Sequence, residues 1–272
     1  MSTEARDTAR QFHDLHARGV LLLPNAWDAG SARLMESLGA KAIATTSAGV
    51  AWSHGYADGD RLPVPLLAAT VEQIRRVVAV PVSVDVESGY SADPVAVGEV
   101  VAAVLDAGAV GINIEDGTGP PDLLRVKIEH AKNAGARLGV DLFVNARTDV
   151  YLRSLVPADR RLDETLARAE RYRAAGADGI FVPGVTDGSE IGAIASAGGL
   201  PLNVLARPGL PPTSELEALG VRRLSAGSWI AAAALARAAT RATGFLRTGA
   251  SEPLAAGALP YADVNALFAE RG

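Results

Sequence analysis

The sequence lacks cysteine altogether, and aromatic residues make up only 5% of its 272 positions. Without cysteine the chain has no disulfide, no thiolate zinc site, no iron–sulfur cluster and no thiol nucleophile. Long apolar runs are missing too, because Arg237 and Arg241 interrupt the alanine-rich stretch that begins at Ser228. No segment therefore has the length and character of a transmembrane helix.

Lysine and histidine are scarce, with three and four residues. Lys41 precedes a predicted strand, and Lys127 and Lys132 lie in a predicted helix, so none stands at the carboxyl end of a strand. This placement argues against a Schiff-base aldolase. The histidines have no metal-ligand spacing. His54 alone follows a predicted strand end, and we interpret it as a loop residue rather than a general base.

Charge and composition narrow the class of protein further. The net charge of −5 argues against a nucleic-acid partner, and the 49% of hydrophobic residues can fill one large core. Residues 1–19 follow a polar amphipathic pattern, which is typical of a helix rather than of a signal peptide. We therefore expect a cytoplasmic protein of one domain over residues 1–272, with no nucleic-acid or membrane partner.

Eight short apolar runs recur between segments of helical spacing. Continuous apolar runs suit strands that are buried on both faces of a parallel sheet. The dipeptide Gly-Ala follows three of the intervening segments, where glycine adopts the left-handed conformation that ends a helix. Eight strand–helix units predict a single (β/α)8 barrel, with an open doubly wound sheet as the alternative. The predicted strands cover 20–24, 42–46, 80–86, 110–115, 142–147, 179–183, 202–206 and 222–226, and the clearest helices 29–38, 66–78, 94–107, 122–138 and 163–175.

The remaining C-terminal residues are expected outside the barrel core, which we place at about 20–246. Residues 248–260 contain proline and glycine and predict a loop. A last short helix is expected around 261–270.

Acidic side chains gather at the carboxyl ends of neighbouring predicted strands, where such barrels build their active sites. Asp85 and Glu87 lie two positions apart and share one face of a strand, and Glu115 ends the next strand. Three carboxylates at one mouth would repel one another, and a hard cation relieves that repulsion. The pattern predicts a metal site on these residues that holds Mg²⁺, with Mn²⁺ as the alternative. Helix capping or pairing with arginines of the rim is the other interpretation.

Arg147 ends the fifth predicted strand inside an apolar run. A guanidinium there suits a substrate carboxylate or phosphonate held through two hydrogen bonds, or else an ion pair with Glu115 or Asp149. Backbone N–H groups after the second strand offer a further cradle for a carboxylate at Ser47-Ala48-Gly49.

Taken in order, five segments resemble the isocitrate lyase/phosphoenolpyruvate mutase superfamily. The ordered set is specific, although each segment alone is common, and the matches extend to about residue 227. The segments are Pro24-Asn25-Ala26-Trp27-Asp28, Thr46-Ser47-Ala48-Gly49, Asp85-Val86-Glu87-Ser88-Gly89-Tyr90, Gly111-Ile112-Asn113-Ile114-Glu115-Asp116 and Ala146-Arg147-Thr148-Asp149.

The resemblance implies an (α/β)8 barrel whose last helix is often exchanged between the subunits of a homodimer or homotetramer. It implies Mg²⁺ bound directly by Asp85, with Glu87, Glu115 and Asp58 reaching the ion through waters. The substrate would be a small α-oxo or α-hydroxy carboxylate, and a C–C or C–P bond would break to leave an enolate stabilised by the metal and Arg147. Catalytic roles follow for Arg147, Glu115 and Asp58, and substrate contacts for Ser47, Ala48, Gly49, Val50, Arg147 and, at the end of the seventh strand, Asn203.

Three positions depart from the family's pattern. After the fourth strand the family lyases carry a Lys-Lys/Arg-Cys-Gly-His loop, where this chain reads Gly117-Thr118-Gly119-Pro120-Pro121. After the sixth strand the lyases have Glu and the mutases His-Ser, where this chain reads Pro183-Gly184, and Glu87 replaces the commoner Asp. We therefore expect an oxaloacetate-type decarboxylation or hydrolysis. The alternatives are C–P chemistry on a phosphonopyruvate-like substrate and a metabolite-binding barrel without turnover.

Overall fold

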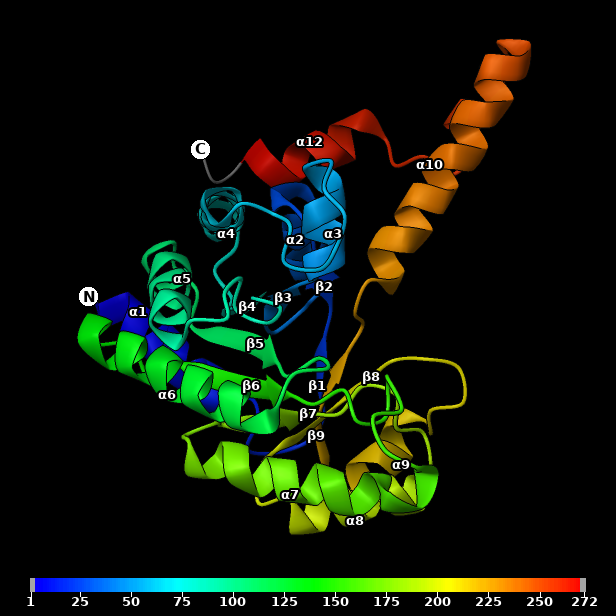
Figure 1. Cartoon of the computed structure of the whole chain (residues 1–272). Coiled ribbons are helices and arrows are strands. Elements are labelled where there is room, and N and C mark those ends of the chain that lie inside the picture. The colour runs from blue at the N-terminus through cyan, green and yellow to red at the C-terminus, as the bar shows by residue number, and fades with distance from the viewer. Residues whose placement is uncertain (1–2, 270–272) are drawn as a thin grey trace.

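The computed structural model describes residues 3–269, and at its centre one parallel sheet closes into a barrel (Figure 1). The strands follow the order β1-β9-β8-β7-β6-β5-β4-β3-β2, and β1 and β2 are two parts of the first barrel strand, separated at Pro24. Proline has no N–H to donate to a strand ladder, which accounts for the break. The predicted (β/α)8 barrel is confirmed. The strands are β1 Leu21–Leu23, β2 Asn25–Ala26, β3 Ile43–Thr45, β4 Val82–Asp85, β5 Gly111–Glu115, β6 Phe143–Arg147, β7 Gly179–Phe181, β8 Leu202–Leu205 and β9 Val221–Ser225.

Helices follow the strands and cover the outside of the barrel. In α5 the sequence signals are plain, because Asp93 caps the helix and Pro94 occupies its first position. Gly39, Gly108 and Gly176 have φ angles of 97°, 99° and 98°, as the Gly-Ala pattern predicted. The helices are α1 Thr3–Asp14, α2 Ala29–Ser37, α3 Ser47–Ser53, α4 Val64–Val77, α5 Pro94–Asp106, α6 Pro121–Leu138, η1 Ala158–Arg160, α7 Arg161–Ala174, α8 Gly188–Ala197, α9 Thr213–Ala218, α10 Trp229–Thr248, α11 Glu252–Ala255 and α12 Tyr261–Ala269.

Helix α3, which begins directly after β3, was not apparent from the sequence pattern. Thr46 caps it, with Oγ1 accepting the N–H of Gly49 at 3.5 Å. A Cβ on Gly49 would lie 2.9 Å from Cβ of Trp27, so only glycine fits this close contact. Tertiary packing therefore outweighs the low helix propensity of glycine here.

The C-terminal part leaves the barrel. Helix α10 extends away from the strands (Figure 1), and the predicted loop over 248–260 is corrected, because it contains the short helix α11. The predicted last helix is confirmed as α12 over the described residues, with Glu270 outside them. It returns to α2, where Nε of Arg33 donates to the carbonyl of Leu267 at 2.7 Å. No helix within residues 3–269 is long and apolar enough to span a membrane.

Helix α1 closes the amino-terminal end of the barrel. The rings of Phe12 and Phe143 meet edge to face at 5.3 Å, and His16 stacks on Phe143 at 4.1 Å. Gly111 in β5 makes room for this plug, since a Cβ there would lie 2.6 Å from the Phe12 ring. Helix α1 therefore covers the end of the barrel opposite the carboxyl ends of the strands, where barrel enzymes place their chemistry.

Candidate active site

The carboxyl ends of the strands surround a cavity of about 150 Å³. Because parallel strands present their carboxyl ends on one side, residues from along the whole barrel sequence meet there. We call this space the polar cavity. It is lined by Asn25, Thr46, Ser47, Ala48, Asp58, Asp85, Asn113, Arg147, Leu152, Phe181, Pro183, Leu205, Ser225, Gly227 and Ser228.

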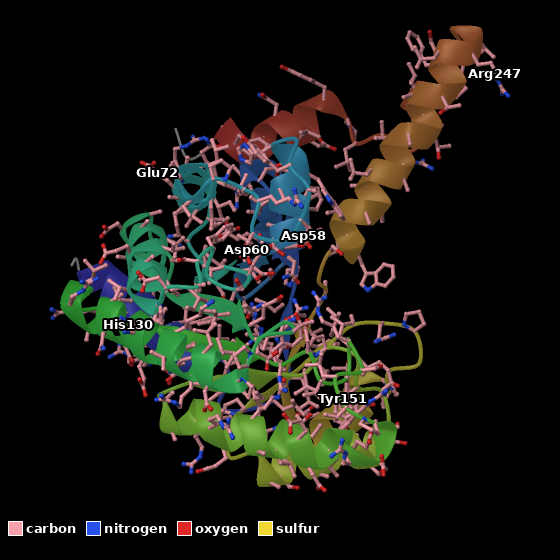
Figure 2. The ribbon with its side chains drawn as sticks, viewed as in Figure 1. Asp58, Asp60, Glu72, His130, Tyr151 and Arg247 are labelled. Atoms are coloured by element: carbon pink, nitrogen blue, oxygen red, sulfur yellow. The ribbon has the colours of Figure 1, made fainter. Side chains whose placement is uncertain are left out.

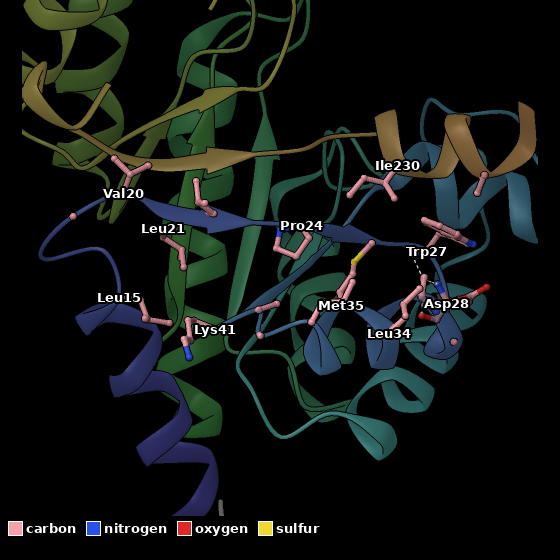
Figure 3. Close-up of a pocket in the computed structure, with 18 of the residues that line it drawn as sticks. Leu15, Val20, Leu21, Pro24, Trp27, Asp28, Leu34, Met35, Lys41 and Ile230 are labelled. Carbon is pink, nitrogen blue, oxygen red and sulfur yellow. Dashed lines mark hydrogen bonds between the residues drawn. The ribbon is translucent and has the colours of Figure 1, made fainter. Parts of the chain in front are cut away.

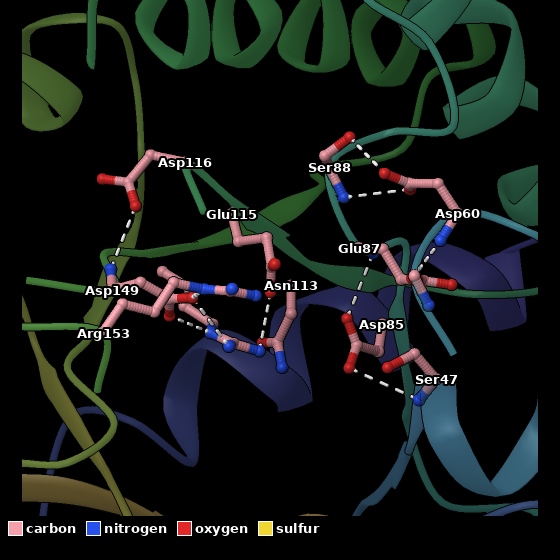
Figure 4. A network of polar contacts seen from close by, with 12 residues as sticks. Ser47, Asp60, Asp85, Glu87, Ser88, Asn113, Glu115, Asp116, Asp149 and Arg153 are labelled. Atoms are coloured by element: carbon pink, nitrogen blue, oxygen red, sulfur yellow. Dashed lines mark hydrogen bonds and ion pairs between the residues drawn. The ribbon is translucent and has the colours of Figure 1, made fainter. Parts of the chain in front are cut away.

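Asp85 ends β4 and lies against the polar cavity (Figure 4). Its own N–H donates to Oγ1 of Thr45 at 2.8 Å, which fixes the strand end. Its carboxylate accepts long hydrogen bonds from the N–H of Ser47 at 3.4 Å and of Glu87 at 3.2 Å. Desolvation raises the pKa of Asp85, and the charge of Arg147 opposes the rise. A desolvated carboxylate with such weak contacts has capacity left for a cation.

Arg147 ends β6 between two acidic residues. One terminal nitrogen lies 2.6 Å from Glu115, and Nε donates to Asp149 at 2.7 Å, so both pairings considered from the sequence occur together. Burial lowers the pKa of Arg147, but the two carboxylates outweigh burial and the net shift is upward. The guanidinium also lies over the ring of Phe181, 5.9 Å from its centroid. Arg147 is thus charged and held in place before any ligand binds.

Glu115 is the acid most affected by its surroundings. Desolvation raises its pKa to about 8, and the nearby charges of Asp85 and Asp149 add to the rise while Arg147 opposes it. Behind it, the carboxylate of Asp116 accepts the N–H of Asp149 at 3.0 Å and so anchors the β6 loop.

Glu87 faces the loop that carries Asp58. Its Oε2 accepts the N–H groups of Gly59 at 2.9 Å and Asp60 at 2.5 Å, and its Oε1 accepts the hydroxyl of Tyr90 at 2.9 Å. Desolvation raises the pKa of Glu87, and the hydrogen bonds from Asp60 and Tyr90 oppose the rise. The carboxylate thus connects the loop after α3 to the loop after β4.

Asp60 connects the same two loops through its own carboxylate. Its carboxylate accepts the hydroxyl of Ser88 at 2.6 Å (Figure 4). It also accepts the N–H of Tyr90 at 3.3 Å. Asp60, Glu87 and Tyr90 adopt positive φ angles of 56°, 52° and 57°, which non-glycine residues rarely do. We call Asp60, Glu87, Ser88 and Tyr90 the loop clasp. Figure 2 places Asp58 and Asp60 beside each other next to α3, so the clasp fixes the segment that brings Asp58 to the polar cavity.

The predicted carboxylates are distributed over two adjoining spaces. Asp85 and Asp58 line the polar cavity, whereas Glu87 and Glu115 line a second hollow of about 380 Å³ together with Arg153. No group of three His, Cys, Asp or Glu side chains within residues 3–269 could hold a metal ion by itself. Asp85 is thus separated from Glu87 and Glu115, and a direct metal ligand at Asp85 stays a prediction.

Only some of the predicted substrate contacts line the polar cavity. Ser47 and Ala48 line the polar cavity, whereas Gly49 and Val50 lie buried in α3 and are not among its lining residues. Asn203 lies buried in β8, where its Oδ1 accepts the hydroxyl of Ser225 at 3.1 Å.

The sequence analysis gave no site role to several cavity residues, among them Asn25, Asn113 and Phe181. Asn113 precedes Glu115 by two positions, so the alternation of strand side chains was a usable signal for it. Asn25 lies in the first of the family-like segments, whereas Phe181 carries no comparable signal, because aromatic side chains at strand ends are common.

The oxygen ligands of the polar cavity fit a hydrated Mg²⁺ ion. Mg²⁺ keeps several waters and binds proteins through one or two carboxylates. Asp85 offers a desolvated carboxylate with long hydrogen bonds, and Asp58 lines the same space. Both are oxygen donors, as a hard cation requires.

Comparison with known proteins identifies the family. The chain matches the phosphoenolpyruvate phosphomutase family over residues 12–269. It is 40% identical to an uncharacterized protein of Mycobacterium tuberculosis, over 95% of this chain and 96% of that protein. It is 30% identical to the oxaloacetate decarboxylase of Bradyrhizobium sp. (strain BTAi1), over 74% of this chain and 70% of the decarboxylase. The crystal structure of a candidate lyase/mutase from Burkholderia cenocepacia J2315 superimposes with a TM-score of 0.89 at 37% identity, covering 98% of both chains. The chain therefore belongs to the phosphoenolpyruvate mutase/isocitrate lyase superfamily of lyases and mutases.

Proposed function

We propose that the protein is a Mg²⁺-dependent lyase that cleaves a carbon–carbon bond of a small α-oxo or α-hydroxy dicarboxylate, by decarboxylation or hydrolysis of an oxaloacetate-like acid. One observation carries the proposal: Asp85 and Arg147 line the same cavity of about 150 Å³. A carboxylate for a cation and a guanidinium for an acid, in so small a space, suit a short anionic substrate. The similarity to oxaloacetate decarboxylases supports this choice of substrate.

The side chains have separable roles in this proposal. Bound at Asp85, Mg²⁺ would act as a Lewis acid toward a substrate oxygen. Arg147 would bind the substrate carboxylate and stabilise the negative charge of the enolate that forms when the bond breaks. Glu115, whose pKa desolvation raises to about 8, would act as a proton donor or acceptor. Asp58, exposed at the edge of the cavity, would accept a proton from water or substrate.

The test is a turnover assay with purified protein, Mg²⁺ and a panel of oxo- and hydroxy-dicarboxylates. Decarboxylation of oxaloacetate gives pyruvate and CO₂, whereas its hydrolysis gives oxalate and acetate, so chromatography follows all of these products. We expect one of these product sets from at least one acid, and its loss when EDTA removes the metal. If no acid is cleaved while Mg²⁺ and oxalate still bind, the protein is a metabolite-binding barrel rather than a lyase.

C–P bond chemistry is the second candidate, because the family that matches the chain is described by a phosphomutase activity. The loop at 117–121 has no lysine, and the loop after β7 reads Pro183-Gly184, where mutases have His-Ser. We therefore expect phosphonopyruvate to remain unchanged when phosphorus NMR follows its incubation with the protein and Mg²⁺. Conversion of that compound would replace the carbon–carbon lyase with the second candidate.

The outer face of β1 suggests how copies of the chain associate. A groove of about 930 Å³ lies between the end of α1, helix α2 and the base of α10 (Figure 3). We call it the apolar groove. Leu22, which points outward from β1, is 56% exposed, and Leu34 and Leu38 of α2 are exposed beside it.

Helix α10 has the matching character. Its exposed large side chains include Trp229, Leu235, Phe245 and Leu246. Exposed apolar surface of this extent marks an interaction site. We propose a homodimer in which α10 of each copy covers the apolar groove of the other, with a homotetramer of two such dimers as the alternative.

A further inference from the structure

Arg223 is a buried positive charge in the middle of the barrel. It lies on β9, whose side chains alternate between the interior and the outer face, and it is only 1% exposed. Its Nε donates to Ser225 and one terminal nitrogen donates to Asn113, both at 3.2 Å. The other terminal nitrogen has no hydrogen-bond partner, and no carboxylate pairs with Arg223, within the described part of the chain. A buried guanidinium without a counter-ion is costly, so a protein that keeps one invites a functional explanation.

The position of Arg223 relative to the polar cavity supplies that explanation. Both of its hydrogen-bond acceptors, Asn113 and Ser225, line the cavity, so the guanidinium lies directly beneath the floor. Desolvation lowers its pKa to about 9, and the charge of Asp85 opposes the fall. Arg223 therefore remains charged at neutral pH.

Arg223 differs in this respect from Arg147, the other guanidinium at the site. Arg147 is paired with Glu115 and Asp149, so much of its field is already neutralised. The field of Arg223 is not offset by a contacting acid among the described residues, and inside a barrel it is weakly screened by water. An anion on the cavity floor would experience it.

We propose that Arg223 is a positioning residue that strengthens the binding of anionic carboxylates, and of the enolate derived from them, from beneath the cavity floor. The inference deepens the proposed function and rests on it. Arg223 acts through its charge and through Asn113, whose Oδ1 it shares with Nδ2 of Asn145 at 2.8 Å. These two donors fix the orientation of the Asn113 amide on the floor.

The neutral variants Arg223→Met and Arg223→Gln test the proposal. In both variants Asn113 still accepts from Asn145, and Ser225, which loses the donor from Arg223, still donates to Asn203. The matched control is Arg222→Met, which removes the same charge from the same strand at a more exposed position. Calorimetry gives two constants for each protein: the Kd of Mg²⁺, and the Kd of oxalate at saturating Mg²⁺. Circular dichroism verifies the fold.

We expect both neutral variants to bind oxalate about tenfold more weakly, the order expected of one charge acting across a partly buried site. Mg²⁺ should bind them as well as wild type or more tightly, because a repelling cation is gone. Arg222→Met should match wild type for both ligands. If Arg223 only supports the fold, the variants should bind both Mg²⁺ and oxalate more weakly, and that result would overturn the inference. An unchanged Kd for oxalate would overturn it as well. A wild-type protein that binds no oxalate at saturating Mg²⁺ overturns the proposed function as well, so the two failures are distinguishable.

Discussion

The apolar groove and the polar cavity both lie against the first barrel strand, but they differ in volume and in the polarity of the side chains that line them. The apolar groove has about 930 Å³ and is lined mainly by aliphatic side chains of β1, of α2 and of the segment between α1 and β1. The polar cavity has about 150 Å³ and is lined by Asp85, Arg147, asparagines and hydroxyl groups. A partner that binds in the apolar groove is stabilised by the burial of apolar surface. The polar cavity instead holds charged side chains whose positions are set by the strand ends. The larger, apolar groove therefore suits a helix of another copy, and the smaller, polar cavity suits the chemical reaction.

The largest effect is expected at Asp85. Asp85→Asn keeps the shape of the side chain but removes its charge, so Mg²⁺ binding should be lost and kcat/KM on the preferred dicarboxylate should fall about 10³-fold. Calorimetry and steady-state kinetics measure the two quantities. Asp106→Asn, at an exposed position on α5, is the control and should behave as wild type. Wild-type Mg²⁺ affinity in Asp85→Asn would show that the metal site is misplaced.

A charged side chain introduced into the apolar groove tests the role of the groove in association. Leu34 on α2 is 37% exposed and lines the groove. Leu34→Glu places a charge against apolar surface, so we expect the dissociation constant of the dimer to rise about 100-fold. Light scattering after size exclusion measures the mass. Val95→Glu, on the exposed face of α5, should leave the mass unchanged. A wild type that is monomeric, or a Leu34→Glu variant with wild-type mass, contradicts the proposed exchange of α10.

Two variants of Glu87 distinguish a structural role in the loop clasp from an electrostatic role in metal binding. In Glu87→Gln the amide oxygen can still accept the N–H groups of Gly59 and Asp60, whereas Glu87→Ala loses them. If Glu87 acts by holding the Asp58 loop, Glu87→Ala should lower kcat/KM about tenfold and Glu87→Gln much less. Hydrogen exchange at Gly59 and Asp60 should accelerate only in Glu87→Ala. Equal loss of Mg²⁺ affinity in both variants would instead indicate that the charge of Glu87 supports the metal.

The last prediction concerns stability rather than activity, at His16, which lies at the end of the barrel opposite the polar cavity. Burial lowers its folded pKa to about 3, below the unfolded value of about 6.5. Between these values the unfolded chain binds the proton and the folded chain does not, so stability falls as the pH is lowered. Wild type should lose up to about 1.4 kcal/mol per pH unit more than His16→Phe between pH 6 and pH 4. Urea unfolding at each pH measures this difference, with His130→Gln as the control. Parallel curves for wild type and His16→Phe would contradict a buried neutral His16.

Much of the fold could be predicted because its signals are local. Eight apolar runs, glycines after helices and a proline-led α5 are read from adjacent residues, and the structure has strands and helices where they predict them. The placement of Asp85 and Arg147 at the mouth followed from the strand period and from the rule that barrel sites lie at carboxyl strand ends. The resemblance to the superfamily added expected roles for these residues, and the family match confirms the membership itself.

The rest depended on contacts between distant residues. Helix α3 required the close approach of Gly49 to Trp27, and the loop clasp joins Asp60 to Ser88 across 28 positions. Of the adjacent Arg222 and Arg223, no local pattern states which one enters the barrel, because a shift of one residue exchanges the two faces of a strand. The sequence by itself therefore determined the repeating units and the acids and arginine at their ends, because these depend on backbone periodicity. Only the tertiary structure decided that α10 leaves the barrel and that a guanidinium lies beneath the polar cavity, because both depend on how the closed sheet is packed and covered.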